Sequence, residues 1–307
     1  MRIAVTGGSG RLGVSVVNHL ASRGHEVHSL DRAASPHVDD AVQQHTLDLT
    51  DAATAKEALG AIRPEGVVHL AAIAVPFSAP EDVILRTNVQ LCFSVLSAAV
   101  DAGASRVLVA SSPTVLGYGT PQGWSPRYLP IDEDHPIAPW NAYALSKATL
   151  EATVRMFVAQ LGDAVRFGAF RPCFVISPEE WRGAPTQQGH TVAERLARPE
   201  LAAVSLFNYV DARDAASFAE RWLEAADQIP NGEVFFVGAD DAMAREPLSE
   251  LVPRFFPGTE GIAAELTGTH AAFTSAKALR LLGWRPQRSW RTELQGEPLA
   301  ATSVHLS

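Results

Sequence analysis

Cysteine and clustered charge are both scarce in this chain. Among its 307 residues there are two cysteines, Cys92 and Cys173. Two are too few for a disulfide framework or a cysteine metal cage, and they suit a reducing compartment. The net charge of -9 is spread along the chain and not gathered into blocks, which argues against a nucleic-acid surface. We therefore expect no metal site and no nucleic-acid partner.

Long apolar runs are missing as well. No run reaches the length of a membrane span, and the first one, residues 3–5, begins too early to leave room for a signal peptide. We therefore expect a cytoplasmic protein with no membrane partner. The composition that is present, 47% hydrophobic and 19% charged, is ordinary for a soluble globular enzyme. The length allows one large domain or a domain with a smaller lobe.

A glycine-rich turn follows the first apolar run. Gly8, Gly10 and Gly13 fit the pattern G-x-G-x-x-G between a short buried strand and an amphipathic segment. Glycine there permits positive φ and close approach of a pyrophosphate, while the helix N-terminus presents free N–H groups to the anion. The turn predicts a dinucleotide site. A structural glycine turn without a ligand is the alternative.

The second expected strand, residues 26–30, ends at Asp31. A carboxylate at this place accepts hydrogen bonds from the adenosine ribose hydroxyls. It favours NAD over NADP, because it repels a 2'-phosphate. Arg32 follows directly, and its guanidinium could pair with that phosphate. The sequence therefore leaves NADP as an alternative cofactor.

Strand and helix patterns alternate along the first half of the chain. This alternation predicts an α/β fold with a Rossmann-type doubly wound parallel sheet. We assign residues 1–170 to an NAD(P)-binding Rossmann domain and residues 171–307 to a smaller C-terminal substrate-binding lobe over the carboxyl ends of the strands. A segment near 204–237 is expected to return to the sheet. The expected strands are residues 3–5, 26–30, 44–47, 66–72, 106–112, 164–170, 204–209 and 233–237.

Tyr143 and Lys147 lie four residues apart on a helix expected at residues 141–161. One helical turn places them on the same face. An ammonium group near a phenol lowers the phenol pKa from its usual value of about 10, which would let Tyr143 exchange a proton with a substrate hydroxyl or carbonyl at neutral pH. A surface pair is the alternative, because this spacing often arises by chance. A long loop rich in Pro and Gly, residues 113–139, precedes the helix, and such loops are usually functional.

Further motifs follow one another in a fixed order. Together they resemble the extended branch of the short-chain dehydrogenase/reductases, which includes NAD-dependent sugar epimerases and dehydratases. The resemblance covers nearly the whole chain. The motifs are Gly7-x-x-Gly10-x-x-Gly13, Asp48-Leu49, Leu70-Ala71-Ala72, Asn88, Ser111-Ser112, Tyr143-x-x-x-Lys147, Arg171-Pro172 and Leu282-Gly283-Trp284-Arg285-Pro286.

The resemblance implies a role for each matching position. Tyr143 is the catalytic acid/base, Lys147 holds the nicotinamide ribose and tunes Tyr143, and Ser112 hydrogen-bonds the reacting oxygen. Asp48 as a strand-end turn and Asn88 as a helix brace are local alternatives. The implied cofactor-binding residues are Gly7, Gly10, Arg11, Leu12, Gly13, Asp31, Arg32, Asp48, Leu49, Leu70, Ala71, Ala72, Asn88, Tyr143, Lys147 and Pro172.

The resemblance also implies a homodimer. In related proteins the long helix, here residues 81–102, and the Tyr143 helix pair across a twofold axis. The apolar residues of the long helix suit such packing, although burial within one chain would give the same pattern. These residues are Leu91, Val95, Ala98 and Ala99.

The chain departs from the sugar-nucleotide members at several places. Cys173 and Phe174 stand where an asparagine is common, and Phe207 stands where an arginine binds the nucleotide diphosphate. Leu116 replaces a tyrosine, and Pro113 replaces the glutamate of the dehydratases. We therefore expect an NAD-dependent oxidoreductase that acts on a secondary alcohol or carbonyl of a small polar, sugar-like substrate. An epimerase or dehydratase without net redox is the first alternative, and a non-catalytic cofactor-sensing protein is the second.

Overall fold

A seven-stranded parallel sheet forms the centre of the protein. The computed structural model describes residues 1–294 of the chain. The strand order is β3-β2-β1-β4-β5-β6-β9, and every neighbouring pair is parallel. The order reverses at β1, which confirms the predicted doubly wound Rossmann-type sheet. The strands are β1 (Arg2–Thr6), β2 (Glu26–Asp31), β3 (Gln43–Thr46), β4 (Gly66–His69), β5 (Arg106–Ala110), β6 (Arg166–Pro172) and β9 (Val234–Val237).

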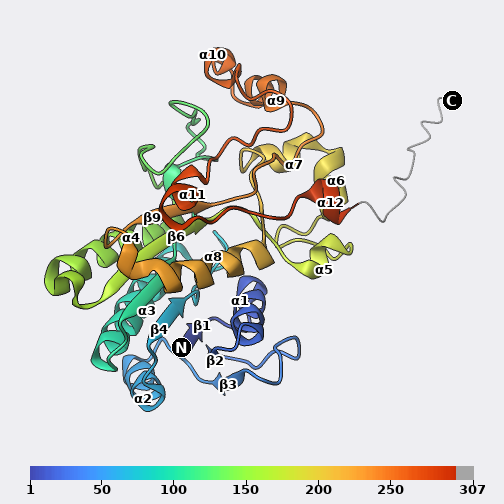
Figure 1. Cartoon of the computed structure of the whole chain (residues 1–307). Coiled ribbons are helices and arrows are strands. Elements are labelled where there is room, and N and C mark those ends of the chain that lie inside the picture. The colour runs from blue at the N-terminus through green and yellow to red at the C-terminus, as the bar shows by residue number, and fades with distance from the viewer. Residues whose placement is uncertain (295–307) are drawn as a thin grey trace.

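Helices cover both faces of this sheet (Figure 1). On one face α1 packs against α8, and on the other α3 packs between α2 and α4. Each face has its own apolar core, so the central strands are buried on both sides and read as continuous apolar runs. The bounds are α1 (Arg11–Ser22), α2 (Ala52–Ile62), α3 (Glu81–Asp101), α4 (Ala142–Leu161) and α8 (Ala212–Ala225).

Capping residues decide where these helices begin and end. Asp51 accepts hydrogen bonds from the N–H groups of Ala53 and Thr54 at the start of α2. Asn141 accepts from the N–H of Ala144 at the start of α4. These caps satisfy amides that have no partner within the first helical turn. Asn141 therefore fixes the turn that carries Tyr143.

The C-terminal lobe lies above the sheet, in yellow to red in Figure 1. Its short strands β7 (Val175–Ile176) and β8 (Val210–Asp211) form a separate parallel pair. Within the described part of this lobe, β9 alone joins the main sheet, next to β6. The remaining helices are α5 (Pro178–Trp181), α6 (Val192–Ala197), α7 (Pro199–Ala203), α9 (Leu248–Phe255), α10 (Glu260–Ala263), α11 (Ala276–Leu282) and α12 (Trp290–Glu293), with 3-10 turns η1 (Pro113–Leu116), η2 (Gly162–Ala164) and η3 (Ala226–Gln228).

The strand expected at residues 204–209 is wrong. The chain turns tightly there, with Leu206 and Phe207 at φ values of 53° and 57°. Asn208 holds the turn, since its Oδ1 accepts from the N–H of Phe174 and its Nδ2 donates to the carbonyl of Ser205. Of the apolar side chains that suggested a strand, Leu206, Phe207 and Tyr209 are buried around this turn, whereas Val204 is exposed. Of the segment near 204–237, residues 234–237 return to the main sheet.

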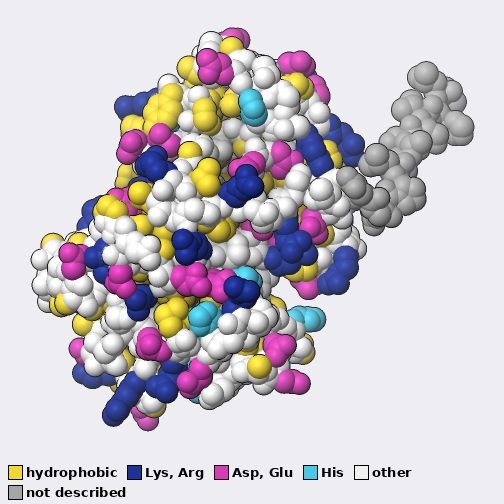
Figure 2. Space-filling view, in the orientation of Figure 1, with side chains coloured by type: hydrophobic (Ala, Val, Ile, Leu, Met, Phe, Trp, Pro, Cys, Tyr) yellow, Lys and Arg dark blue, Asp and Glu magenta, His cyan; other side chains and the backbone are white. Residues whose placement is uncertain are grey.

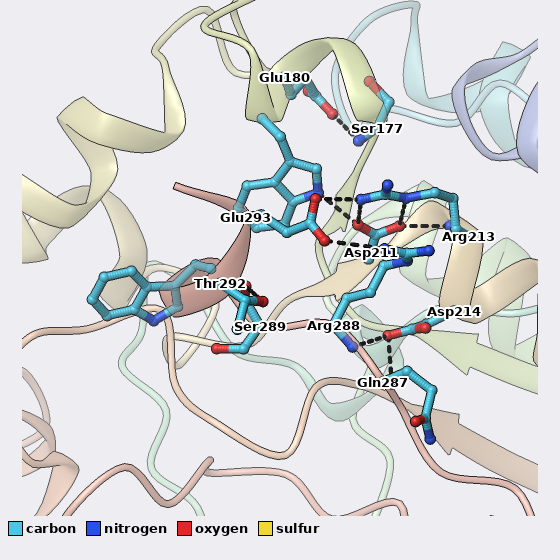
Figure 3. A network of polar contacts seen from close by, with 12 residues as sticks. Ser177, Glu180, Asp211, Arg213, Asp214, Gln287, Arg288, Ser289, Thr292 and Glu293 are labelled. Atoms are coloured by element: carbon cyan, nitrogen blue, oxygen red, sulfur yellow. Dashed lines mark hydrogen bonds and ion pairs between the residues drawn. The ribbon is translucent and has the colours of Figure 1, made fainter. Parts of the chain in front are cut away.

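A polar network ties the last described segment to the rest of the protein (Figure 3). Asp214 on α8 accepts from the N–H groups of Gln287 and Arg288, at 2.9 and 2.8 Å. Arg213 joins the carboxylate of Asp211 to that of Glu293 on α12. These contacts hold the segment between α11 and α12 against the N-terminal end of α8.

The surface charge and helix α3 are the features that concern the expected partners: nucleic acid, a membrane and a second copy of this chain. On the face shown in Figure 2, acidic and basic side chains are interspersed. Within the described residues, α3 is the one helix long and apolar enough to span a membrane by length and composition, although no such run was expected. It lies between α2 and α4, as core helices of the same composition do. The four residues of α3 expected at a dimer interface are instead buried within this chain: Leu91, Val95, Ala98 and Ala99.

Candidate active site

One cavity of about 890 Å³ opens at the carboxyl ends of the parallel strands. Every predicted site residue lines it except Asn88. We call its two ends the glycine half and the tyrosine half. The glycine half is lined by Gly7, Gly10, Arg11, Leu12, Gly13, Leu30, Asp31, Arg32, Leu47, Asp48, Leu49 and Thr50; the tyrosine half by Ser112, Thr114, Tyr118, Trp140, Tyr143, Lys147, Phe174, Gln188, Val204, Ser205 and Asn208.

Close backbone packing shapes the glycine turn. A Cβ atom on Gly13 would lie 2.0 Å from the carbonyl oxygen of Gly7, and one on Gly7, whose φ is +72°, would lie 2.7 Å from the backbone nitrogen of Ala71. Side chains are therefore excluded at both positions. Gly10 is the N-cap of α1 and supplies no capping side chain, so the first-turn amides of this helix face the cavity. Gly8 packs against Ser29 beneath the turn.

Two acids stand at the rim of the glycine half. Asp31 accepts from the N–H groups of Ser9 and Arg32, at 3.1 and 2.7 Å, which fixes its carboxylate beside the turn. Asp48 accepts from the N–H and the hydroxyl of Thr50, and these hydrogen bonds lower the pKa of Asp48. Asp48 therefore stabilises a turn after a strand and also lines the cavity.

Three groups converge in the tyrosine half. Tyr143 and Lys147 extend from one face of α4, and Ser112 begins η1 directly after β5. Lys147 is 4% exposed; its Nζ donates to the carbonyl of Ala110 at 2.7 Å and lies 5.7 Å from the centre of the Tyr143 ring. The N–H and the hydroxyl of Thr114 both donate to Ser112 Oγ, at 3.2 and 2.9 Å. The Ser112 hydroxyl proton is thus left to donate elsewhere.

The expected lowering of the Tyr143 pKa is wrong for this structure. Burial raises the pKa of Tyr143 to about 12, while a hydrogen bond with Ser112 opposes the rise. Burial also lowers the pKa of Lys147 to about 8. The ammonium points to the Ala110 carbonyl, so desolvation of the phenol outweighs the attraction that the four-residue spacing suggested.

A buried ion pair continues the same face of α4. Glu151, four residues after Lys147, accepts from Arg171 Nε and Nη2 at 2.8 and 2.9 Å and from Ser111 Oγ at 2.6 Å. Arg171 lies near the end of β6 and Ser111 directly follows β5, so this cluster holds α4 against the two strand ends beside the cavity. Sequence reasoning missed Glu151, although its spacing from Lys147 was a usable signal.

Asn88 lies behind the cavity wall and not in it. Its Oδ1 accepts from the N–H of Ile73 at 2.8 Å, and its Nδ2 donates to the carbonyl of Ile73 and to Ser146 Oγ. Ile73 itself lines the cavity. The alternative of a bracing residue fits these hydrogen bonds, and the expected contact of Asn88 with the cofactor stays a prediction.

The lobe and the long loop complete the tyrosine half. Tyr118 and Trp140 come from the loop after η1, and Trp140 Nε1 donates to the carbonyl of Tyr118 at 3.1 Å. Gln188, Ser205 and Asn208 come from the lobe. The segments were recognised as irregular from the sequence, but no spacing rule indicated which of their side chains reach the cavity.

The model of the NAD dependent epimerase/dehydratase family matches residues 3–238 of this chain. The chain belongs to this family. Enzymes of the short-chain dehydrogenase type make up the family and its named relatives, so the protein is such an enzyme and NAD is its cofactor.

Named relatives of this family member include both reductases and epimerases. A 4-hydroxy-2-methyl-3-oxo-4-farnesyl-3,4-dihydroquinoline-1-oxide ketoreductase of Stigmatella aurantiaca is 30% identical over 93% of this chain and 81% of its own. A UDP-glucose 4-epimerase of Lactobacillus helveticus is 30% identical over 56% of this chain and about half of its own, 51%. The structure of a Thermus thermophilus UDP-glucose 4-epimerase complexed with NAD has a TM-score of 0.68 at 23% identity, covering 96% and 97% of the two chains; it shows the shared fold.

The glycine half fits the cofactor of this NAD-dependent family. Backbone at Gly7 and Gly13 packs too closely for side chains, the N-terminus of α1 lacks a side-chain cap, and Asp31 stands beside them. These residues would hold the pyrophosphate and the adenosine ribose. Arg32 is exposed at the rim.

Proposed function

We propose that the protein is an NAD-dependent oxidoreductase that interconverts a secondary alcohol and a ketone on a small polar, sugar-like substrate, with Tyr143 as acid/base. One observation carries the proposal. Ser112, Tyr143 and Lys147 meet in the half of the cavity opposite the glycine turn, where a dinucleotide bound by its phosphates would end.

Each of these side chains has a distinct part in alcohol oxidation. Bound NAD supplies the hydride acceptor. Tyr143 accepts the proton of the substrate hydroxyl, and Ser112, whose oxygen is already held by Thr114, donates to the reacting oxygen. The Lys147 ammonium, held by the Ala110 carbonyl, is proposed to bind the nicotinamide ribose. Reduction reverses these proton movements.

The size and lining of the cavity favour a compact substrate. Ordinary single-ligand pockets measure roughly 300–1,000 Å³, so a cavity of about 890 Å³ that contains a dinucleotide has room for a small second molecule. Phe207, at the position where an arginine would meet a nucleotide diphosphate, is fully buried. These features support direct oxidation of a free metabolite over chemistry on a nucleotide sugar.

Absorbance of NADH tests this function. Enzyme incubated with NAD and a panel of polyols, sugars and hydroxy acids is expected to accumulate NADH with at least one of them. The second candidate function is epimerisation, in which the hydride returns to the substrate, because an epimerase is among the named relatives. Stereochemical inversion of a sugar without accumulation of NADH would establish that second function and exclude the first.

We also propose a homodimer formed by α3 and α4. Exposed apolar side chains on these helices support it: Phe93 is 49% exposed, Leu145 43% and Met156 41%. Changing Phe93 and Met156 to Asp is expected to give a monomeric mass in sedimentation at micromolar concentration. Leu279→Asp on α11, where the leucine is 51% exposed, is the control and should leave a dimer. A monomeric wild-type protein would rule the proposal of a homodimer out.

The cytoplasmic location expected from the sequence stays a prediction.

A further inference from the structure

Arg195 on α6 is a fully buried cation, 0% exposed. Its guanidinium lies over the Phe174 ring, 4.0 Å from the centre. Nη1 donates to Gln188 Oε1 at 2.7 Å and lies 3.2 Å from His190 Nε2, while Nη2 donates to Ser205 Oγ at 2.6 Å. The side chain is held in one place by its neighbours, which belong to the cavity wall.

No carboxylate compensates this charge. Within residues 1–294 the partners of Arg195 are an amide, an imidazole, a hydroxyl and a ring, and its Nε has no hydrogen-bond partner. Burial accordingly lowers the pKa of Arg195 to about 10. Burial also lowers the pKa of His190, which disfavours a second positive charge, and an imidazole supplies no negative one. Burying an uncompensated cation is costly, and a single cation–π contact offsets a small part of that cost.

The guanidinium lies directly behind the tyrosine half. Phe174, Gln188 and Ser205, which contact it, all line the cavity. Tyr118 also lines it; burial raises the pKa of this phenol, and both Tyr143 and Arg195 lie near enough to affect it. The acids of the cavity lining, Asp31 and Asp48, belong to the glycine half. The tyrosine half is therefore positive, with Lys147 and Arg195 near it.

We propose that the substrate carries an anionic oxygen group, a carboxylate or a phosphate monoester, which binds against Gln188 with Arg195 behind it as its countercharge. The Ser205 hydroxyl accepts from Arg195 and donates to the carbonyl of Ala202, so Gln188 is the donor that faces the anion. The inference rests on the proposed oxidoreductase function and narrows its substrate class. Arg195 holds the amide oxygen of Gln188, so the amide nitrogen, a donor of two hydrogen bonds, is the end that remains for the anion. A buried charge acts strongly across such a wall because the local dielectric is low.

A matched set of substrates tests the inference. The set pairs short polyhydroxy acids with their uncharged carboxamides and adds the corresponding sugar phosphates. With the wild-type enzyme, KM for the anion is expected to be about 10- to 100-fold lower than for the carboxamide, and whether the acid or the phosphate is preferred identifies the anion. Equal KM values for acid, phosphate and carboxamide would overturn the inference.

Variants of Arg195 distinguish a role of its charge in substrate binding from a purely structural role. Arg195→Met is expected to bring the KM ratio of carboxamide to acid close to one while kcat for the carboxamide changes little, and Arg195→Lys is expected to restore part of the ratio. A purely structural arginine would instead change both substrates alike. Arg198→Met is the matched control, because Arg198 is exposed and paired with Glu200, and it should keep the wild-type ratio.

A readout without turnover accompanies the kinetics. In saturating NADH, which fills the glycine half, the preferred anion is expected to raise the Tm of wild type but not of Arg195→Met. If Arg195→Met does not fold, Gln188→Ala takes its place, and an unchanged KM ratio in that variant counts against the inference. Oxidation of carboxamides as efficient as that of acids defeats this inference alone, whereas no NADH from any alcohol defeats the proposed function.

Discussion

The two halves of the cavity are built in different ways. The glycine half comes from short connections between consecutive elements: the turn from β1 to α1, the end of β2 and the residues after β3. The tyrosine half gathers α4, the long loop, the strand end at Phe174 and two separate parts of the lobe. Local backbone geometry therefore builds the glycine half, whereas contacts between distant segments build the tyrosine half.

The largest expected effect separates chemistry from binding. Tyr143→Phe removes the proposed acid/base and should lower kcat by roughly 10³-fold, because the phenol is the group proposed to carry the proton of the substrate hydroxyl. The affinity for NADH, measured by fluorescence titration, should stay within about twofold, since the glycine half is untouched. A kcat within tenfold of wild type would assign the proton transfer to another group.

A single added methyl group is expected to disrupt the glycine half. Gly13→Ala places a Cβ 2.0 Å from the Gly7 carbonyl oxygen, and displacing that backbone should weaken NAD binding by roughly 100-fold in calorimetry. Gly60→Ala is the control, because nothing lies within 4 Å of its Cβ position on α2. Unchanged NAD affinity in Gly13→Ala would show that the turn does not carry the cofactor.

The pH profile of ketone reduction examines the tyrosine half. Reduction needs the protonated phenol of Tyr143, whose pKa of about 12 keeps it protonated at neutral pH. The Lys147 ammonium loses its proton as the pH rises through about 8. kcat/KM for reduction should therefore be flat below that pH and fall above it, by up to about tenfold per pH unit. Lys147→Met should lack this step; a step that persists in the variant would point to a different group.

The smallest effect concerns the wall that Asn88 supports. Asn88→Ala removes its hydrogen bonds to Ile73 and Ser146 and should lower kcat/KM by about three- to tenfold. Asn18→Ala removes a similar pair, to His37 and Asp39, away from the cavity, and should leave kcat/KM unchanged. Equal kinetic effects of the two variants would mean that Asn88 matters to stability alone.

Sequence reasoning succeeded where one element dictates the next. The strand and helix pattern and the tight glycine turn at Gly7, Gly10 and Gly13 depend on periodicity, caps and backbone space, all of which are local. It failed at residues 204–209, where Asn208 stabilises a turn within an apolar stretch. It also failed for the pKa of Tyr143, and it left the role of Asn88 open between two alternatives, because burial and the direction of a side chain are set by neighbours far away in the chain.

By itself, the sequence determined the sheet, the glycine turn and the helical spacing of Tyr143, Lys147 and Glu151, since each follows from the geometry of a few successive residues. Only the tertiary structure decided that Asn88 stands behind the wall and that Arg195 is buried beside the tyrosine half without an acid. The physical reason is that charge compensation and desolvation depend on everything within a few ångströms of a group, and those neighbours come from segments that the chain order does not place together.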